Sequence, residues 1–172
     1  MSRVKGFAGK YLSVDLTEGS LEDRVFDEKT LRRFLGGTGI GSKILYDEVP
    51  PTSEWSDPVN RIIIASGPLN GTSVGGSGTI SIVTKGALTG GAASVQANGY
   101  FGAYVKLSGY DGFIIHGASK RWLYLYVEDG RVELRDGNHL LGMGTYETAD
   151  SIKNELGKKE KEMSVLSIGP AG

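Results

Sequence analysis

The alternation of apolar and polar positions predicts short strands along most of the chain. Tyr11–Leu16 alternates, Thr17–Ser20 carries turn-forming residues, and Leu21–Phe26 alternates again, which is typical of a β-hairpin. Residues 61–66 form a short run rich in β-branched residues, which predicts a buried strand, and residues 79–84 alternate like a second one. No internal repeat is visible.

The second half of the chain shows the same pattern. Residues 112–116 and 163–168 are each expected to form a strand. Residues 122–135 read as a hairpin that turns at Asp129-Gly130, because this dipeptide accepts the positive φ that tight hairpin turns require.

The helices are expected to be few and short. Their predicted ranges are 28–35, 42–47, 100–107 and 145–156. Asp27 is placed to cap the first helix, Gly36-Gly37 to end it, and Gly157 to end the last. Because strands dominate and do not alternate regularly with helices, the pattern predicts an α+β fold of mostly antiparallel sheet.

The length of 172 residues suits a single domain covering residues 1–172. The last residues, Ile168–Gly172, are loop-forming and directly follow a predicted strand. Such a loop should lead to another element, so we expect a chain cut at Gly172 from a longer protein.

Charge and composition exclude several classes of function. The formal net charge of -1 provides no field to attract nucleic acid or an anionic membrane, and no apolar run is long enough to span a bilayer. The absence of cysteine excludes disulfides and any Cys-bound cluster within these residues, and it fits a cytoplasmic location. With only His116 and His139, a His-rich metal site is also excluded.

Residues Gly36–Lys43 (GGTGIGSK) resemble nucleotide-binding loops only superficially. A P-loop needs Lys followed by Ser or Thr, whereas here Ser42 precedes Lys43. A dinucleotide fingerprint needs a strand before its glycines, and a helix is predicted there. The favoured interpretation is a connection between two helices, and the alternative is a loop that lines the edge of a ligand.

Glycine is the outlier in the composition. It accounts for 27 residues, about twice its usual share of about 7%. Ten of them fall in Gly67–Gly102, where bulky side chains are nearly absent. This region could be a flat, backbone-lined surface for a large planar ligand, or a tightly turned corner of a sheet, and composition alone leaves both open.

At this region the sequence resembles the N-terminal domain of aldehyde ferredoxin oxidoreductases, and the resemblance extends over nearly the whole chain. The matching pieces include KYLSVDLTEGSL, FLGGTGIGSKIL, Gly67–Ser73, Val83–Lys85, Leu88–Gly90, Asn98–Gly102, KLSGYD at 106–111, and Ile168–Gly172. Each piece is weak by itself, but their order and spacing together are specific.

The resemblance implies a cofactor and partners. Members of the family use tungsten held by two pterin dithiolenes with a bridging magnesium ion, and for this chain molybdenum is the less favoured alternative to tungsten. They oxidise aldehydes to carboxylates and pass electrons through a [4Fe–4S] cluster to ferredoxin or another redox subunit. The cluster belongs to later domains, so this chain alone is expected to be inactive. Self-association over the exposed small-residue surface is also expected.

The same resemblance assigns the site residues, all through the backbone. The cofactor contacts implied are Gly76, Ser77, Gly78, Thr79, Val95, Gln96, Ala97, Asn98 and Gly99. The carbonyl of Gln96 is the implied magnesium contact, in a loop at 95–99 whose Asn98 would cap the following helix. No catalytic residue is assigned.

Four places depart from the residues that the family often carries. Thr79 stands for arginine, GALTG at 86–90 for SPLTG, Gln96 for asparagine, and Asn98 for glycine. A threonine cannot supply the charge or the fork of donors of an arginine. This replacement favours a second hypothesis, a stand-alone binding or assembly module without catalysis.

Overall fold

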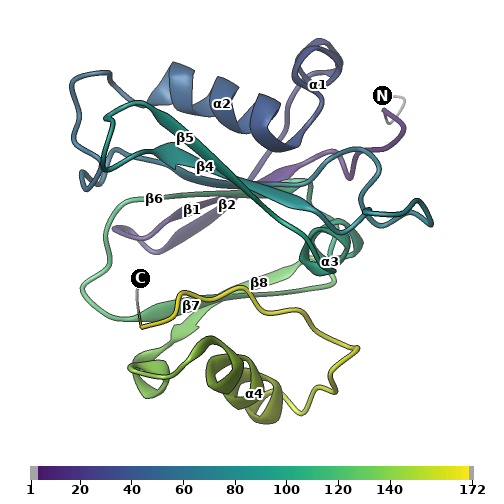
Figure 1. The fold of residues 1–172 in the computed structure, drawn as a ribbon, viewed down its shortest axis with the longest axis vertical. Helices are drawn as coiled ribbons and strands as arrows, with labels where there is room; N and C mark the ends of the chain where they lie inside the picture. Colours follow the sequence, from purple (N-terminus) through teal and green to yellow (C-terminus); the bar gives the residue numbers. More distant parts are fainter. Residues whose placement is uncertain (1–3, 171–172) are drawn as a thin grey trace.

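The computed structural model describes residues 4–170 and contains two sheets (Figure 1). The larger sheet has the order β2-β1-β6-β3-β4-β5 and the smaller one is the hairpin β7-β8. The strands are β1 (Tyr11–Asp15), β2 (Ser20–Arg24), β3 (Ile62–Ala65), β4 (Ile80–Lys85), β5 (Ala92–Ala97), β6 (Gly112–His116), β7 (Leu123–Glu128) and β8 (Arg131–Asp136). All pairs are antiparallel except β1 with β6, which confirms the α+β prediction.

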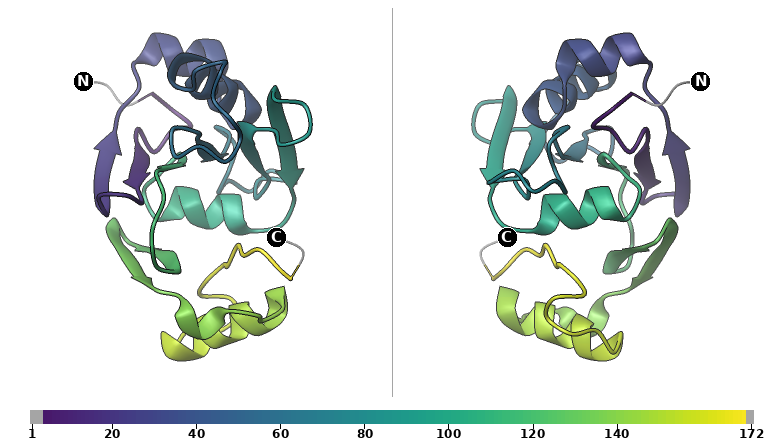
Figure 2. Two further views of the ribbon diagram at one scale, coloured as in Figure 1. Left: turned by 90° about the vertical axis from the view of Figure 1, so that its left-hand side faces the viewer. Right: turned by 90° about the vertical axis from the view of Figure 1, so that its right-hand side faces the viewer.

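The helices lie on both sides of the larger sheet. They are α1 (Glu28–Phe34), α2 (Gly37–Glu48), α3 (Phe101–Leu107) and α4 (Thr145–Glu155), with a 3-10 turn at Asn138–Leu140. Helices α1 and α2 cover one face, whereas α3, the hairpin β7-β8 and α4 lie on the other (Figures 1 and 2).

Two apolar clusters follow from the alternation of side chains along the strands. On the α2 face, Tyr11, Ile63 and Ile114 are buried with residues of the helix. On the opposite face, Leu12 and Ile64 are buried with Val105 of α3. Because successive strand residues point to opposite faces, one sheet supplies both clusters.

Several local predictions are confirmed. The Asp27 side chain accepts a hydrogen bond of 2.6 Å from the Thr30 N–H and caps α1. The hairpin β7-β8 turns at Asp129 and Gly130, whose φ angles are 47° and 82°. Helix α4 is followed by Gly157 with φ of 64°.

The glycine run at 36–43 was assigned wrongly. Helix α2 begins at Gly37, so the run is its first turns and not a connection. The glycines permit close packing, because a Cβ on Gly41 would lie 2.6 Å from Val83 Cγ2 and one on Gly36 would lie 2.4 Å from the Ser66 carbonyl oxygen. Packing against β3 and β4 therefore overrides the low helix propensity of glycine.

The expected loop at 95–99 is partly a strand. Val95, Gln96 and Ala97 belong to β5, where Gln96 pairs with Ser81 of β4. Asn98 does not cap α3, since Tyr100 occupies the N-cap position with no side-chain bond. The strand expected at 163–168 is also absent, because these residues pair with no other strand in the described chain.

Candidate functional site

The two segments predicted to contact a cofactor are neighbours in space. The Gly102 N–H donates a 3.0 Å hydrogen bond to the Gly78 carbonyl oxygen at the start of α3. A Cβ built on Gly78 would lie only 1.7 Å from the Gly99 carbonyl oxygen, so no other residue fits there without movement. The fold thus brings residues 76–79 next to residues 95–99.

Thr79 and Asn98 join the same two segments through their side chains. The Thr79 hydroxyl lies 2.9 Å from Asn98 Oδ1 and 3.0 Å from the Gly76 carbonyl oxygen, so it can donate to either acceptor. Thr79 is half-buried and Asn98 is exposed. The contact therefore lies at the rim of the surface, where β4 begins and β5 has ended.

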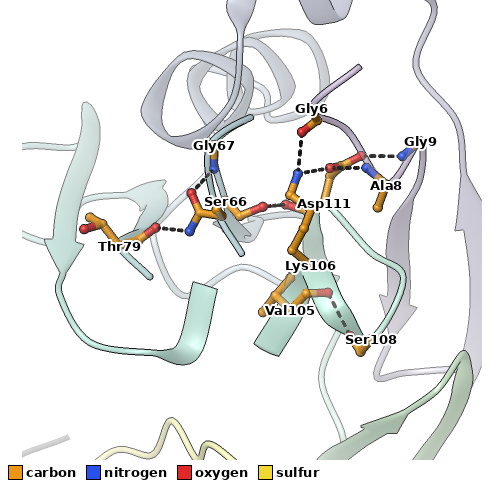
Figure 3. Close-up of polar contacts among 11 residues, drawn as sticks. Gly6, Ala8, Gly9, Ser66, Gly67, Thr79, Val105, Lys106, Ser108 and Asp111 are labelled. Carbon is orange, nitrogen blue, oxygen red and sulfur yellow. Dashed lines mark hydrogen bonds and ion pairs between the residues drawn. The ribbon is translucent and has the colours of Figure 1, made fainter. Parts of the chain in front are cut away.

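The buried side chain of Asn70 holds the segment at Thr79 from the interior of the protein. The sequence did not reveal this role. The Asn70 side-chain amide donates to the Thr79 carbonyl oxygen at 2.7 Å and its Oδ1 accepts from the Gly67 N–H at 2.8 Å. Figure 3 shows Gly67 and Thr79 at the two ends of this bridge. The sequence signal was an asparagine among turn-forming residues in GPLNG, and a buried asparagine needs such partners.

The outer side of these segments is open. A Cβ on Gly75, Gly76 or Gly99 would meet nothing within 4 Å. The apolar side chains there are exposed, with Val95 at 60% and Tyr100 at 77%. This arrangement confirms the expectation of an exposed, small-residue surface and disfavours a closed sheet corner.

The surface carries almost no charge. Between Gly67 and Val105 the only charged residue is Lys85, which is buried and donates to the Pro51 carbonyl oxygen at 2.7 Å. Within residues 4–170 no group of three or more acidic, His or Cys side chains could hold a metal ion. A ligand here would be held by main-chain groups and shape.

A large planar group with phosphates fits this donor set. Gly76 and Gly99 leave room for close approach, and their φ angles of 80° and 133° suit glycine. β5 ends the sheet, so alternate main-chain groups on its outer side have no strand partner in the described chain. Magnesium would find main-chain carbonyl oxygens here and no carboxylate.

A well-formed apolar cavity lies elsewhere. It has a volume of about 970 Å³ and lies between α3, β6, the hairpin β7-β8 and residues 162–170. Its lining is mainly apolar and includes none of the nine predicted cofactor contacts. The candidate surface therefore lies outside this cavity.

An ion pair next to the surface, between the half-buried Lys106 and the buried Asp111, has a structural role. The Asp111 carboxylate accepts from the Ala8 N–H at 2.8 Å and the Gly9 N–H at 2.7 Å, and it pairs with Lys106 (Figure 3). Lys106 in turn donates to the Gly6 carbonyl oxygen at 3.1 Å. These bonds fasten the N-terminal segment to α3. They also occupy both the Asp111 carboxylate and the Lys106 amine.

The two histidines belong to other parts of the fold. His116 Nδ1 lies 3.8 Å from Asp15, and His139 Nε2 lies 3.1 Å from Glu155.

Tyr11 is also distant from acid–base chemistry. Burial raises the pKa of the Tyr11 phenol, with a smaller contribution from Asp111, so Tyr11 stays neutral in the core. None of these groups supplies an acid–base pair at the candidate surface.

Comparison with known proteins decides the family. Residues 11–172 match the family described as "Aldehyde ferredoxin oxidoreductase, N-terminal domain". The chain belongs to this family. The resemblance inferred from its motifs is thereby confirmed.

Curated relatives of this aldehyde ferredoxin oxidoreductase N-terminal domain are much longer proteins. The tungsten-containing aldehyde ferredoxin oxidoreductase of Pyrococcus abyssi is 40% identical over 167 residues, which are 97% of this chain and 27% of that protein. The enzyme of the same name from Pyrococcus furiosus is 37% identical over 95% of this chain and 27% of its own length. The domain thus spans about a quarter of these relatives.

Other similar proteins are named for different reactions. The WOR-like subunit of an aliphatic sulfonate oxidoreductase from Pyrococcus furiosus is 34% identical over 96% of this chain and 28% of its own length. Among solved structures, the active site complex BamBC of benzoyl coenzyme A reductase with 1,5-dienoyl-CoA has a TM-score of 0.88 and 38% identity. That match covers 91% of this domain and 24% of the solved chain.

Proposed function

We propose that this domain forms the base of a tungsten bis-pterin site in a longer oxidoreductase. The observation that carries the proposal is the meeting of residues 76–79 with residues 95–99 on an open, uncharged face. The similarity to tungsten-containing enzymes over nearly the whole chain supports it.

The roles follow from the chemistry that the face offers. The main chain of Gly76–Thr79 and of Val95–Gly99 would bind and orient the cofactor, and the Gln96 carbonyl would contact the bridging magnesium. When bound, the metal supplies the redox chemistry. The domain itself supplies shape and excludes water from one side of the group.

The proposed reaction is oxidation of an aldehyde and water to a carboxylate and three protons, with the two electrons leaving through a [4Fe–4S] cluster. The cluster would be held by later domains, because this chain has no cysteine, and ferredoxin or another redox subunit would accept the electrons. Tungsten is preferred over molybdenum since the relatives are named as tungsten-containing. Within the described residues no helix has the length and apolar character to cross a bilayer.

A second candidate is a non-catalytic binding or assembly module. The neutral Thr79 favours it, because the family often has a charged arginine at this position. The similarity to an aliphatic sulfonate oxidoreductase subunit and to a benzoyl coenzyme A reductase complex supports a third possibility, a substrate other than an aldehyde.

Metal analysis and turnover of the full-length protein separate these candidates. We expect about one tungsten per chain and reduction of a viologen dye with aldehydes as donors. Tungsten without aldehyde turnover would point to another substrate on the same cofactor. A full-length protein purified from its native host without tungsten or molybdenum would contradict the cofactor proposal and favour the module.

A further inference from the structure

The side chains of Thr79 and Asn98, one from each of the two cofactor segments, are in contact. In the structure the Thr79 hydroxyl lies 2.9 Å from Asn98 Oδ1. The same hydroxyl lies 3.0 Å from the Gly76 carbonyl oxygen within its own segment, so Asn98 supplies the acceptor that connects it to the other segment.

We propose that Thr79 and Asn98 are paired positioning residues, which hold the two cofactor segments together and keep this part of the surface uncharged. The inference rests on the proposed function. It assigns these side chains a role beyond the backbone contacts of their segments.

The hydrogen bond between Thr79 and Asn98 can restrict the motion of both segments. Thr79 is anchored on the inside by Asn70, which donates to its carbonyl oxygen at 2.7 Å. Asn98 is exposed, follows the last residue of β5 and precedes Gly99, whose φ is 133°. The Thr79 hydroxyl thus links a well-anchored segment to one that leaves the sheet.

The charged residues near this face are already paired or bonded, so a charge added to the face would have no nearby partner. Lys85 is buried and bonded to the Pro51 carbonyl oxygen, and Lys106 pairs with the buried Asp111. No other charged residue falls between Gly67 and Lys106. Phosphate groups at this face would therefore be met by main-chain N–H dipoles, and an added negative charge would not be offset locally.

Three variants distinguish the role of the hydrogen bond in ordering the two segments from the role of the missing charge. Thr79→Val removes the hydroxyl and keeps the shape, whereas Thr79→Ser keeps the hydroxyl. Asn98→Asp keeps an acceptor for that hydroxyl but adds a negative charge. Each variant is measured as the 172-residue chain by amide hydrogen exchange, and in the full-length protein by tungsten content.

For exchange, we expect Thr79→Val to raise the rates of residues 76–79 and 98–100 about fivefold, as loss of one hydrogen bond of ~1 kcal/mol would do. Thr79→Ser and Asn98→Asp should keep the parent rates. Equal exchange in Thr79→Val and the parent would overturn the positioning role.

For the cofactor, we expect tungsten to fall severalfold in Thr79→Val and in Asn98→Asp, and to stay at the parent level in Thr79→Ser. Full tungsten in Asn98→Asp would overturn the claim that neutrality matters. A parent protein without tungsten would instead contradict the proposed function, while the exchange rates of the 172-residue chain would still decide whether the pair orders the surface.

Discussion

At the scale of the residue, glycine has two different uses on the candidate surface. Gly78 is required by close approach, since a Cβ would lie 1.7 Å from the Gly99 carbonyl oxygen. Gly75 faces open space, so a Cβ there would meet nothing within 4 Å. A high glycine content alone did not reveal this difference, because it depends on which segments the fold brings together.

A matched pair of alanine substitutions tests this distinction. Gly78→Ala should destabilise the chain by about 3 kcal/mol, because the backbone of Gly99 must move to relieve the overlap. For a chain of this size the loss corresponds to a melting temperature lower by roughly 6–12 °C. Gly75→Ala should stay within about 0.5 kcal/mol of the parent. Thermal unfolding followed by circular dichroism measures both, and equal midpoints would show that the two segments do not pack as described.

At the scale of the element, sequence reasoning succeeded where local chemistry decides the structure. Asp27 at the start of α1 and Asp129-Gly130 between β7 and β8 act on their immediate neighbours, so their effects are visible in the sequence. β5 was missed because Ala, Ser and Gln do not favour strands, and pairing with β4 creates the strand. The start of α2 was missed for a similar reason, since packing against Val83 decides it. Residues 163–168 show the opposite case. Their side chains alternate between apolar and polar, but they have no partner strand and form no strand.

The position of Gln96 in β5 gives a second test. Gln96→Ala should leave the tungsten content of the full-length protein within about twofold of the parent, because the main-chain carbonyl remains. Gln96→Pro should reduce it severalfold, because proline fixes φ near −65° and turns the backbone out of the strand. Metal analysis of the two purified variants decides, and equal tungsten in both would mean that this part of β5 does not hold the cofactor.

The hairpin β1-β2 carries a pH-dependent link to Tyr110. Asp23 accepts from Lys10 at 2.7 Å and from the Tyr110 hydroxyl at 3.0 Å. The bond from Lys10 lowers the pKa of Asp23 below its ordinary value of 3.8, and Tyr110 adds to this. The pKa of Lys10 is raised above 10.5, mainly by Asp23.

This link should stabilise the fold at neutral pH and weaken at both extremes. Because the folded pKa of Asp23 is lowered, its contribution is present above about pH 3.8 and is lost as the pH falls through the folded value. Because the pKa of Lys10 is raised, its contribution is present below pH 10.5 and is lost as the pH rises through the folded value. Melting temperatures between pH 2.5 and 7 should fall less steeply for Asp23→Asn than for the parent; parallel curves would contradict the role of Asp23.

At the scale of the whole molecule, the candidate cofactor surface and the apolar cavity lie in different parts of the fold. The residues that the family resemblance assigned to the cofactor lie together on an open face beside α3 and the end of β5. The apolar cavity of about 970 Å³ lies between α3 and the hairpin β7-β8 and contains none of them. The resemblance to the family pointed to these segments from the sequence alone. The contacts of Asn70 with Thr79 and of Thr79 with Asn98 could be found only in the three-dimensional structure.

Anomalous diffraction at a tungsten absorption edge, from crystals of the full-length protein, would locate the metal relative to the open face. We expect one strong peak for each chain over this face, with the pterin density in contact with the main chain of residues 76–79 and 95–99. A tungsten peak whose ligands contact neither segment, such as one seated at the apolar cavity, would contradict this expectation.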